Sequence, residues 1–204
     1  MQTPTLTVAI FIVFANAGES QTLRELSRKQ GAVEMVVNTE YAPTTLAELA
    51  VRADVVVEGN TSTCASSLTT DERSIDTDCT VQVARVFKGN TAGGTIKLRR
   101  PGGTVYIEGQ KVTVMADASA TPDSAKSYIL FLKRDDASRT FSLLFGPQGV
   151  LTVANDMVIQ DPGLGPDEQV PTMTLDDFPE GIGGFDRSGT QIGYLCLNYD
   201  RVRT

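Results

Sequence analysis

The fold is decided by a stretch of alternating residues near the middle of the chain: Asp78-Cys79-Thr80-Val81-Gln82-Val83-Ala84-Arg85-Val86-Phe87-Lys88-Gly89. Apolar and polar side chains that alternate over this many positions are typical of a long β-strand with one face in a core. Gly89 then favours a turn, because glycine adopts the backbone conformations that turns require. Strand-like runs precede and follow this stretch, so the sequence predicts a sheet built around it.

The far end of this strand leaves two arrangements open. Val81 and Val83 share one face, whereas Val86 has the opposite parity. An inward Val86 requires a β-bulge near Ala84-Arg85, and we expect one because barrel closure commonly uses bulges. In the alternative, Phe87 continues the inward face and Val86 lies outside.

The remaining strands are expected from similar short apolar runs separated by Gly, Pro and Asn turns. They are Val55 to Cys64, Ile75 to Phe87, Thr95 to Leu98, Val112 to Met115, Tyr128 to Leu132, Phe141 to Phe145 and Val150 to Val153. The run Tyr128 to Leu132 is apolar on both faces, which fits a strand covered on both sides. Short strands at this spacing predict a mainly β sandwich or small barrel.

One or two short helices are expected before the strands. Thr22 and Glu25 are spaced as a capping box at the start of residues 20–31, and Gly31 is a stop signal. Thr45 and Glu48 have the same spacing before a second short apolar run. Between the two helices, Val33, Met35 and Val37 alternate like a strand.

The N-terminus is expected to be an export signal. Residues 1–17 hold an apolar run of about nine residues followed by Ala15-Asn16-Ala17, a small-x-small cleavage pattern, although no Lys or Arg precedes the run. Such a run is too short to span a bilayer, so no membrane span is expected after cleavage. The alternative is a buried N-terminal strand. Secretion or a periplasmic location is therefore predicted, with an N-terminal extension over residues 18–45.

Charge is concentrated near the C-terminus. Residues 161–190 hold seven acidic residues and one arginine, which accounts for nearly all of the net charge of −7. A Pro- and Gly-rich acidic stretch is usually a solvated linker or tail, so residues 159–204 are expected to be an irregular acidic tail. Calcium binding or partner docking is the alternative, but no DxDxDG pattern is present. The acidic balance disfavours nucleic acid as a partner.

Three cysteines are present. Cys64 and Cys79 lie symmetrically about Asp71-Glu72, so a hairpin with its tip there places them opposite each other, close enough for a disulfide. Two free thiols are the alternative. Cys196 remains, either as a buried thiol or as a site of intermolecular pairing.

Catalysis and cofactor binding are not expected. The chain has no histidine, which excludes Ser-His-Asp and Cys-His catalysis and HExxH zinc sites. It also lacks a phosphate-binding loop, a GxSxG motif and zinc-ligand cysteine spacing, so no metal or cofactor is predicted. The sequence thus predicts a protein that is not an enzyme.

The central strands resemble those of netrin-like, or TIMP-like, OB-fold domains. The matching segments are Ala53 to Gly59, Val81 to Gly89 and Ser127 to Leu132. Pro101-Gly102-Gly103 and Gln148-Gly149 resemble features of uncharacterised bacterial secreted members. The resemblance covers residues 46–158 and implies an OB-like Greek-key barrel of five to six strands with a helix near one end.

The family's zinc-chelating inhibition is not implied for this chain. The metalloproteinase inhibitors that the core resembles use a mature N-terminal cysteine, whereas the expected mature N-terminus here is Gly18 and no cysteine precedes Cys64.

A non-catalytic binding module for a protein or other extracellular ligand is therefore expected. Candidate contacts are Arg99, Arg100 and Tyr106 near the Gly-rich turn, because an aromatic beside two arginines can stack a sugar or bind a carboxylate. The alternative for these three residues is a charged, solvated edge strand. The alternative function is protease inhibition through the polar loop Ala116 to Asp123, which otherwise is an ordinary surface connection.

Overall fold

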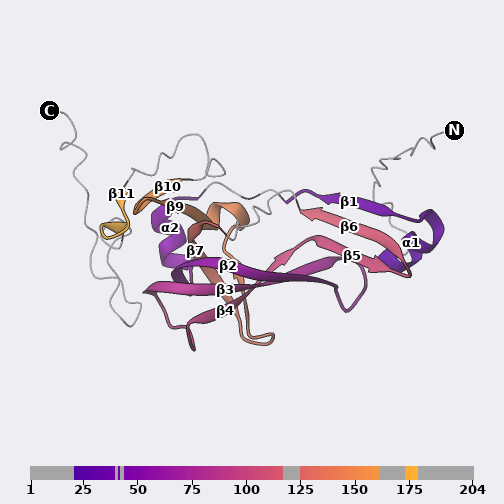
Figure 1. Cartoon of the computed structure of the whole chain (residues 1–204), viewed down its shortest axis with the longest axis horizontal. Coiled ribbons are helices and arrows are strands. Elements are labelled where there is room, and N and C mark those ends of the chain that lie inside the picture. Colours follow the sequence, from indigo (N-terminus) through magenta and orange to yellow (C-terminus); the bar gives the residue numbers. More distant parts are fainter. Residues whose placement is uncertain (1–20, 40, 42–43, 117–124, 161–172, 179–204) are drawn as a thin grey trace. The chain divides into compact units, whose positions relative to one another are not determined.

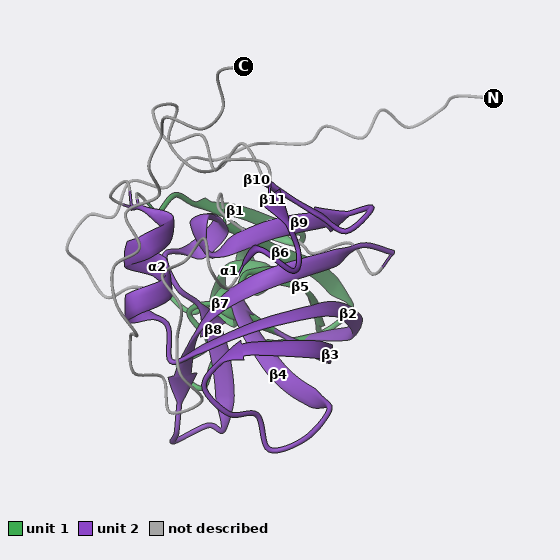
Figure 2. Ribbon diagram, turned by 90° about the vertical axis from the view of Figure 1, so that its left-hand side faces the viewer, with its two compact units in different colours: residues 1–39, 66–77, 101–117 green, residues 40–65, 78–100, 118–204 purple. Residues whose placement is uncertain are grey.

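The computed structural model describes residues 21–39, 41, 44–116, 125–160 and 173–178. The protein is mainly β, with two short α-helices among the described residues (Figure 1). Its contacts divide the chain into two compact units (Figure 2). Unit 1 comprises residues 1–39, 66–77 and 101–117, and unit 2 comprises residues 40–65, 78–100 and 118–204. Residues 46–158 include parts of both units; the expectation that they form one domain stays a prediction, and each unit is described by itself.

Unit 2 contains most of a barrel-like ring of five strands; residues 66–68, 75–77 and 101 of these strands are assigned to unit 1. The strand order β7-β2-β3-β4-β8 is completed by an additional pairing of β8 with β7. The β4–β8 seam is parallel and is made by one residue pair, Leu98 with Phe141. A ring joined so narrowly is a partly open barrel, as expected for an OB-like fold. The five strands are β2 (Val55–Leu68), β3 (Ile75–Lys88), β4 (Thr95–Pro101), β7 (Ser127–Asp135) and β8 (Thr140–Leu143).

The strand β7 separates two apolar cores in unit 2, because its alternating side chains enter both. Leu130 and Leu132 belong to a core with residues from β2, β3 and β4. Ile129 and Phe131 belong to a second core, which α2 (Leu46–Arg52) covers with Leu49 and Ala50. The prediction that Tyr128 to Leu132 is covered on both sides is confirmed.

The sheet continues from β7 through β9 (Val150–Ala154) and β10 (Met157–Gln160) to β11 (Met173–Thr174), and the 3-10 helix η1 (Gly146–Gly149) precedes β9. Leu175 and Phe178 follow β11 and are buried in the α2-side core. The Phe178 ring lies 5.0 Å from the ring of Phe87 and 6.3 Å from that of Phe131, edge to face in both pairs. Residues 173–178 therefore differ from the solvated stretch expected over 161–190, because their apolar side chains enter a core.

The inward Val86 expected from a bulge near Ala84-Arg85 is not found, because Val86 is 42% exposed. Ala84 and Arg85 are exposed as well, and Phe87 packs against the core covered by α2, whereas Val81 and Val83 belong to the core shared with β4. Gly89 follows with a positive φ of 76°, and a Cβ there would lie 2.4 Å from the Asp54 carbonyl oxygen. The predicted glycine turn is confirmed, and both its conformation and its close contact require glycine.

Unit 1 contains a three-stranded sheet with the order β1-β6-β5, where β1 and β6 are parallel. The strands are β1 (Val33–Val37), β5 (Gly103–Ile107) and β6 (Gln110–Ala116). Helix α1 (Leu23–Gln30) contributes Leu23 to a core with Val33, Ile75 and Val112. The reciprocal capping box of Thr22 and Glu25 is present, as predicted.

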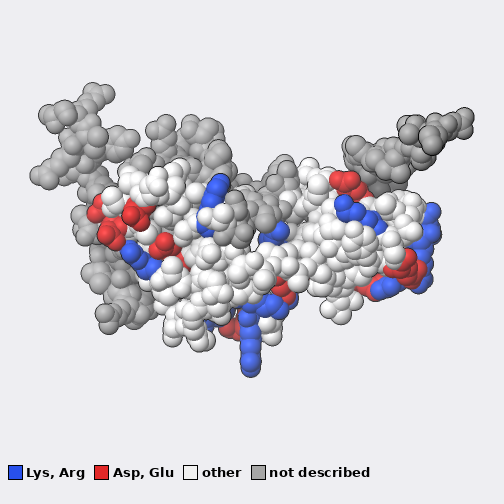
Figure 3. All heavy atoms as spheres, in the orientation of Figure 1, with Lys and Arg blue, Asp and Glu red and all other residues white. Residues whose placement is uncertain are grey.

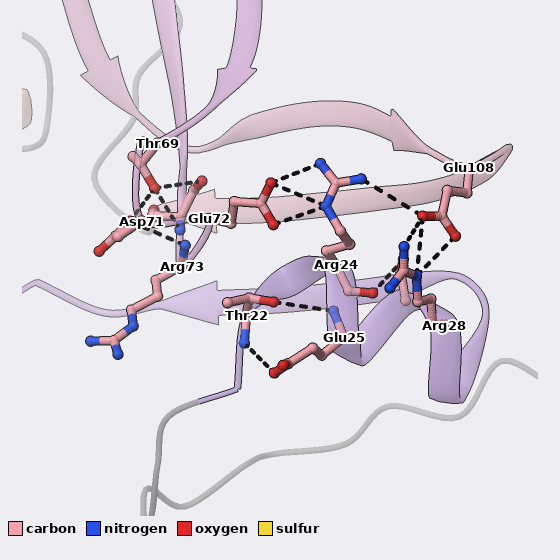
Figure 4. Close-up of polar contacts among 11 residues, drawn as sticks. Thr22, Arg24, Glu25, Arg28, Thr69, Asp71, Glu72, Arg73 and Glu108 are labelled. Atoms are coloured by element: carbon pink, nitrogen blue, oxygen red, sulfur yellow. Dashed lines mark hydrogen bonds and ion pairs between the residues drawn. The ribbon is translucent and has the colours of Figure 1, made fainter.

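Ion pairs join α1 to two turns of unit 1 (Figure 4). The Arg24 guanidinium donates to both carboxylate oxygens of Glu72, and that of Arg28 donates to both oxygens of Glu108. The Leu23 amide also donates to the Glu72 carbonyl oxygen at 2.8 Å. Acidic and basic side chains consequently lie together at the α1 end of this unit (Figure 3). These charges stabilise unit 1 and balance one another.

Candidate binding cleft

The predicted disulfide is present: the sulfur atoms of Cys64 and Cys79 are bonded. The strand β2 ends at Leu68 and β3 begins at Ile75, so the intervening turn has its centre at Asp71-Glu72, as the spacing predicted. Cys79 is fully buried, while Cys64 is exposed on its strand. The bridge cross-links β2 and β3.

The three residues proposed as contacts from sequence lie in different units. Arg99 and Arg100 lie on β4 in unit 2, whereas Tyr106 lies on β5 in unit 1 with 73% of its surface exposed. Adjacent residues of a strand point to opposite faces, so the two arginines are also separated from each other. Arg100 is half-buried, and burial lowers the pKa of its guanidinium. Their role in binding stays a prediction.

Arg99 is held by Asp78 of β3. Its Nε donates to Oδ1 of Asp78 at 2.7 Å and its terminal nitrogen donates to Oδ2 at 3.0 Å, which is a bidentate pair. Lys97 Nζ lies 2.8 Å from the same Oδ2. The hydrogen bonds from Arg99, followed by those from Lys97, lower the pKa of Asp78 to about 2. Asp78 therefore stays ionised and fixes two cations of β4.

A cleft of about 620 Å³ opens beside the β4–β8 seam of unit 2. Because Leu98 and Phe141 are the one pair that joins these strands, neighbouring residues on either side are left to line the opening. The lining comes from β3, β4, β7, β8 and the turns between them, labelled in Figure 2. The lining residues are Thr80, Asn90, Ala92, Thr95, Ile96, Lys97, Arg134, Asp136, Arg139 and Phe141.

The charged lining is predominantly basic, with three cations and one carboxylate. The guanidinium carbon of Arg134 lies 5.5 Å from the centre of the Phe141 ring, which is a cation–π contact. Its terminal nitrogen donates to the Asn90 carbonyl oxygen at 2.7 Å. One N–H group and one ring thus orient Arg134, and its remaining donors are available to a ligand.

Arg139 differs from the other two cations. Its side chain is exposed and makes no hydrogen bond or ion pair with any described residue. Its φ of 54° lies in the left-handed region, where a side chain costs about 1 kcal/mol relative to glycine. Nothing in the described fold requires arginine at this turn.

Sequence reasoning missed this cleft, although a signal was present. Basic residues flank the expected turn on both sides, as Lys133-Arg134 before it and Arg139 after it. Lys97 precedes Arg99 by two positions, which places both on one face of a strand. The pairing of β4 with β8 was needed to bring these two groups together.

Several expectations fall outside the described residues. They are the export signal over 1–17, the loop residues 117–123, most of the acidic tail and Cys196. Within the described residues, no three His, Cys, Asp or Glu side chains are grouped closely enough to hold a metal ion. No described helix has the length and apolar character needed to cross a membrane.

Comparison with known proteins gives no further assignment. Neither a protein-family model nor a curated protein sequence matches this chain significantly.

Proposed function

We propose that this protein is an exported, non-catalytic binding module that holds a small ligand in the cleft beside the β4–β8 seam. The observation that carries the proposal is the cleft itself, which combines an opening of about 620 Å³ with basic, polar and apolar lining. Small-molecule sites commonly have volumes of about 300–1,000 Å³ and a few placed polar groups.

The position of the cleft supports the same proposal. In OB-like barrels the face formed by the second and third strands, together with the turn between the last two strands, is a recurrent ligand surface. Here those elements correspond to β3, β4 and the β7–β8 turn, which all line the cleft. This is an analogy at the level of the fold, and the proposal depends on the basic, polar and apolar residues that line the cleft.

Export is supported by the disulfide and by residues 1–17. A Cys64–Cys79 bridge is stable in an oxidising compartment, and the apolar run with Ala15-Asn16-Ala17 fits a cleaved signal. The full chain produced in a secreting bacterial host is expected to have the mass of residues 18–204 with one disulfide. An uncleaved chain with three free thiols would contradict export.

Binding is tested by ligand-observed NMR with a set of oligosaccharides, citrate and phosphate. At least one compound is expected to bind the wild-type protein and to be recovered chemically unchanged. Ala92→Trp, which fills the cleft without changing charge, should abolish binding. Ala65→Trp, at an exposed position of β2 outside the lining, is the matched control. Binding that survives Ala92→Trp, or conversion of the bound compound, would refute the proposal.

The alternative of protease inhibition depends on residues 117–123, which lie outside the described residues. It stays a prediction from sequence.

A further inference from the structure

Resting on the proposed function, we infer that the ligand of the cleft is an acidic saccharide, a short oligosaccharide that contains uronic acid. Such a ligand combines carboxylates, hydroxyl groups and the apolar C–H faces of sugar rings. The cleft offers a complementary group for each of these three features.

The carboxylate is matched by the cations. Lys97, Arg134 and Arg139 outnumber the single carboxylate of the lining, Asp136. Lys97 forms an ion pair with Asp78, and Arg134 donates a hydrogen bond to the Asn90 carbonyl oxygen. Arg139 has no such partner among the described residues, so it is the principal anchor for an incoming carboxylate, which its planar group can bind through two N–H donors.

The conformation of Arg139 supports this role. Arg139 has a left-handed backbone conformation, which glycine and asparagine adopt more readily than arginine. Its side chain makes no hydrogen bond or ion pair with a described residue that would offset this cost. Backbone strain without a compensating contact in the fold is a feature of ligand-binding positions. The cost is accounted for if the side chain binds a ligand.

The hydroxyl groups are matched by Asp136 and by neutral polar residues. A ligand that presents anionic oxygens and no hydroxyl donors would be repelled by Asp136. Sugar hydroxyls instead donate hydrogen bonds to a carboxylate. They can also donate to, and accept from, the side chains of Thr80, Asn90 and Thr95. The one carboxylate among the cations therefore favours a ligand that carries both charge and donors.

The sugar rings are matched by the apolar lining, which Ala92, Ile96 and Phe141 provide. Ile96 is buried, and Phe141 is held in place under Arg134. The volume of about 620 Å³ suits a short oligosaccharide, since it lies within the range of small-molecule sites.

The experiment is isothermal titration calorimetry of the full-length protein with trigalacturonate and trimannuronate. Galactotriose, which lacks carboxylates, and citrate, which lacks sugar rings, are the comparison ligands. At least one uronate is expected to bind ten-fold or more tightly than both comparison ligands. Equal binding of galactotriose, or of citrate, would overturn the inference while leaving a ligand-binding cleft in place.

Two variants test the residue roles. Arg139→Asn, which suits the left-handed turn, is expected to weaken uronate binding about ten-fold or more with an unchanged melting temperature. Arg73→Gln removes one exposed arginine of unit 1, whose guanidinium has no contact drawn in Figure 4, and should leave the affinity unchanged. An equal loss of uronate affinity in both variants would show that only the net charge of the protein matters, and would overturn the assignment of Arg139.

Asp136→Ala separates a saccharide site from a plain anion site. It is expected to weaken uronate binding several-fold, because hydroxyl donors lose their acceptor, and to strengthen citrate binding, because a repulsive charge is removed. Tighter uronate binding in Asp136→Ala would overturn the role given to hydroxyl groups. If no uronate binds, the inference fails; if in addition no other compound binds in the cleft, the proposed function fails with it.

Discussion

Replacing Asp78 with asparagine tests the charge cluster that positions the basic residues of β4. The substitution keeps the shape of the side chain but removes the negative charge that binds Arg99 and Lys97. Amide and carboxylate are nearly isosteric, so the loss reports on electrostatics and charge-assisted hydrogen bonds.

The magnitude follows from the pKa of Asp78, which falls from an ordinary 3.8 to about 2 in the folded protein. At about 1.4 kcal/mol for each pH unit, this corresponds to about 2 kcal/mol of stability. The Lys97 and Arg99 side chains are 54% and 38% exposed, and solvent screening reduces the contribution. We therefore expect Asp78→Asn to lower the free energy of unfolding by about 1–2 kcal/mol at pH 7.

The pH dependence has a definite sign. A carboxylate with a depressed pKa stabilises the fold fully above its unfolded pKa of 3.8, and this stability is lost as the pH falls toward 2. The difference between wild type and Asp78→Asn should accordingly shrink between pH 4 and pH 2. Urea denaturation at a series of pH values measures it.

A matched control is available in the same unit. Asp136→Asn removes one carboxylate whose side chain is exposed and makes no hydrogen bond or ion pair with a described residue. It should change the free energy of unfolding by less than about 0.5 kcal/mol. A difference for Asp78→Asn that is equally small at pH 7, or that does not change between pH 4 and pH 2, would refute the reasoning.

Three further perturbations test the packing. Replacing both Cys64 and Cys79 with alanine should lower the free energy of unfolding by about 3 kcal/mol, because the bridge closes a loop with a sequence separation of 15; denaturant midpoints unchanged by the replacement would contradict a formed disulfide. Gly59→Ala would place a Cβ 2.4 Å from the Gln82 carbonyl oxygen and should cost about 2–3 kcal/mol in thermal or urea unfolding, and a neutral effect would contradict the close approach of β2 and β3. Phe178→Ala should cost about 3–5 kcal/mol, since its ring is fully buried against Phe87 and Phe131. A cost below 1 kcal/mol would show that residues 173–178 do not pack on the sheet.

Local features were predictable because short-range chemistry determines them. The Thr22–Glu25 capping box, the glycine turn at Gly89 and the Cys64–Cys79 bridge follow from residue types at fixed spacing. The two-faced burial of β7 follows from an unbroken apolar run. Each depends on residues close in sequence or on the symmetry of a single hairpin.

Features that depend on distant pairings were not predictable. The division into two units arises because β1 pairs in parallel with β6, far along the chain, and no local pattern encodes this partner. Phe178 is buried although it follows Asp176 and Asp177. The acidic composition of the stretch predicted exposure, but composition does not show which individual side chains are buried. Val86 is exposed and Phe87 packs against the core covered by α2, an arrangement that the local alternation of residues does not show.

The candidate site illustrates the same limit. Arg99 was chosen for its place near the Gly-rich turn, but Asp78 holds it in a bidentate pair. Lys97 and Arg139 come together at the cleft through the seam between β4 and β8. A parallel contact of one residue pair leaves no signal in the sequence.

The most direct test of the binding cleft is an NMR titration of the full-length, 15N-labelled protein with trigalacturonate, read residue by residue at the backbone amides. The account predicts that the largest shifts occur at residues 95–97 of β4 and residues 134–141 of the β7–β8 hairpin, while the strands of unit 1 stay unchanged. Shifts confined to β1, β5 and β6, or no shift at saturating ligand, would contradict it.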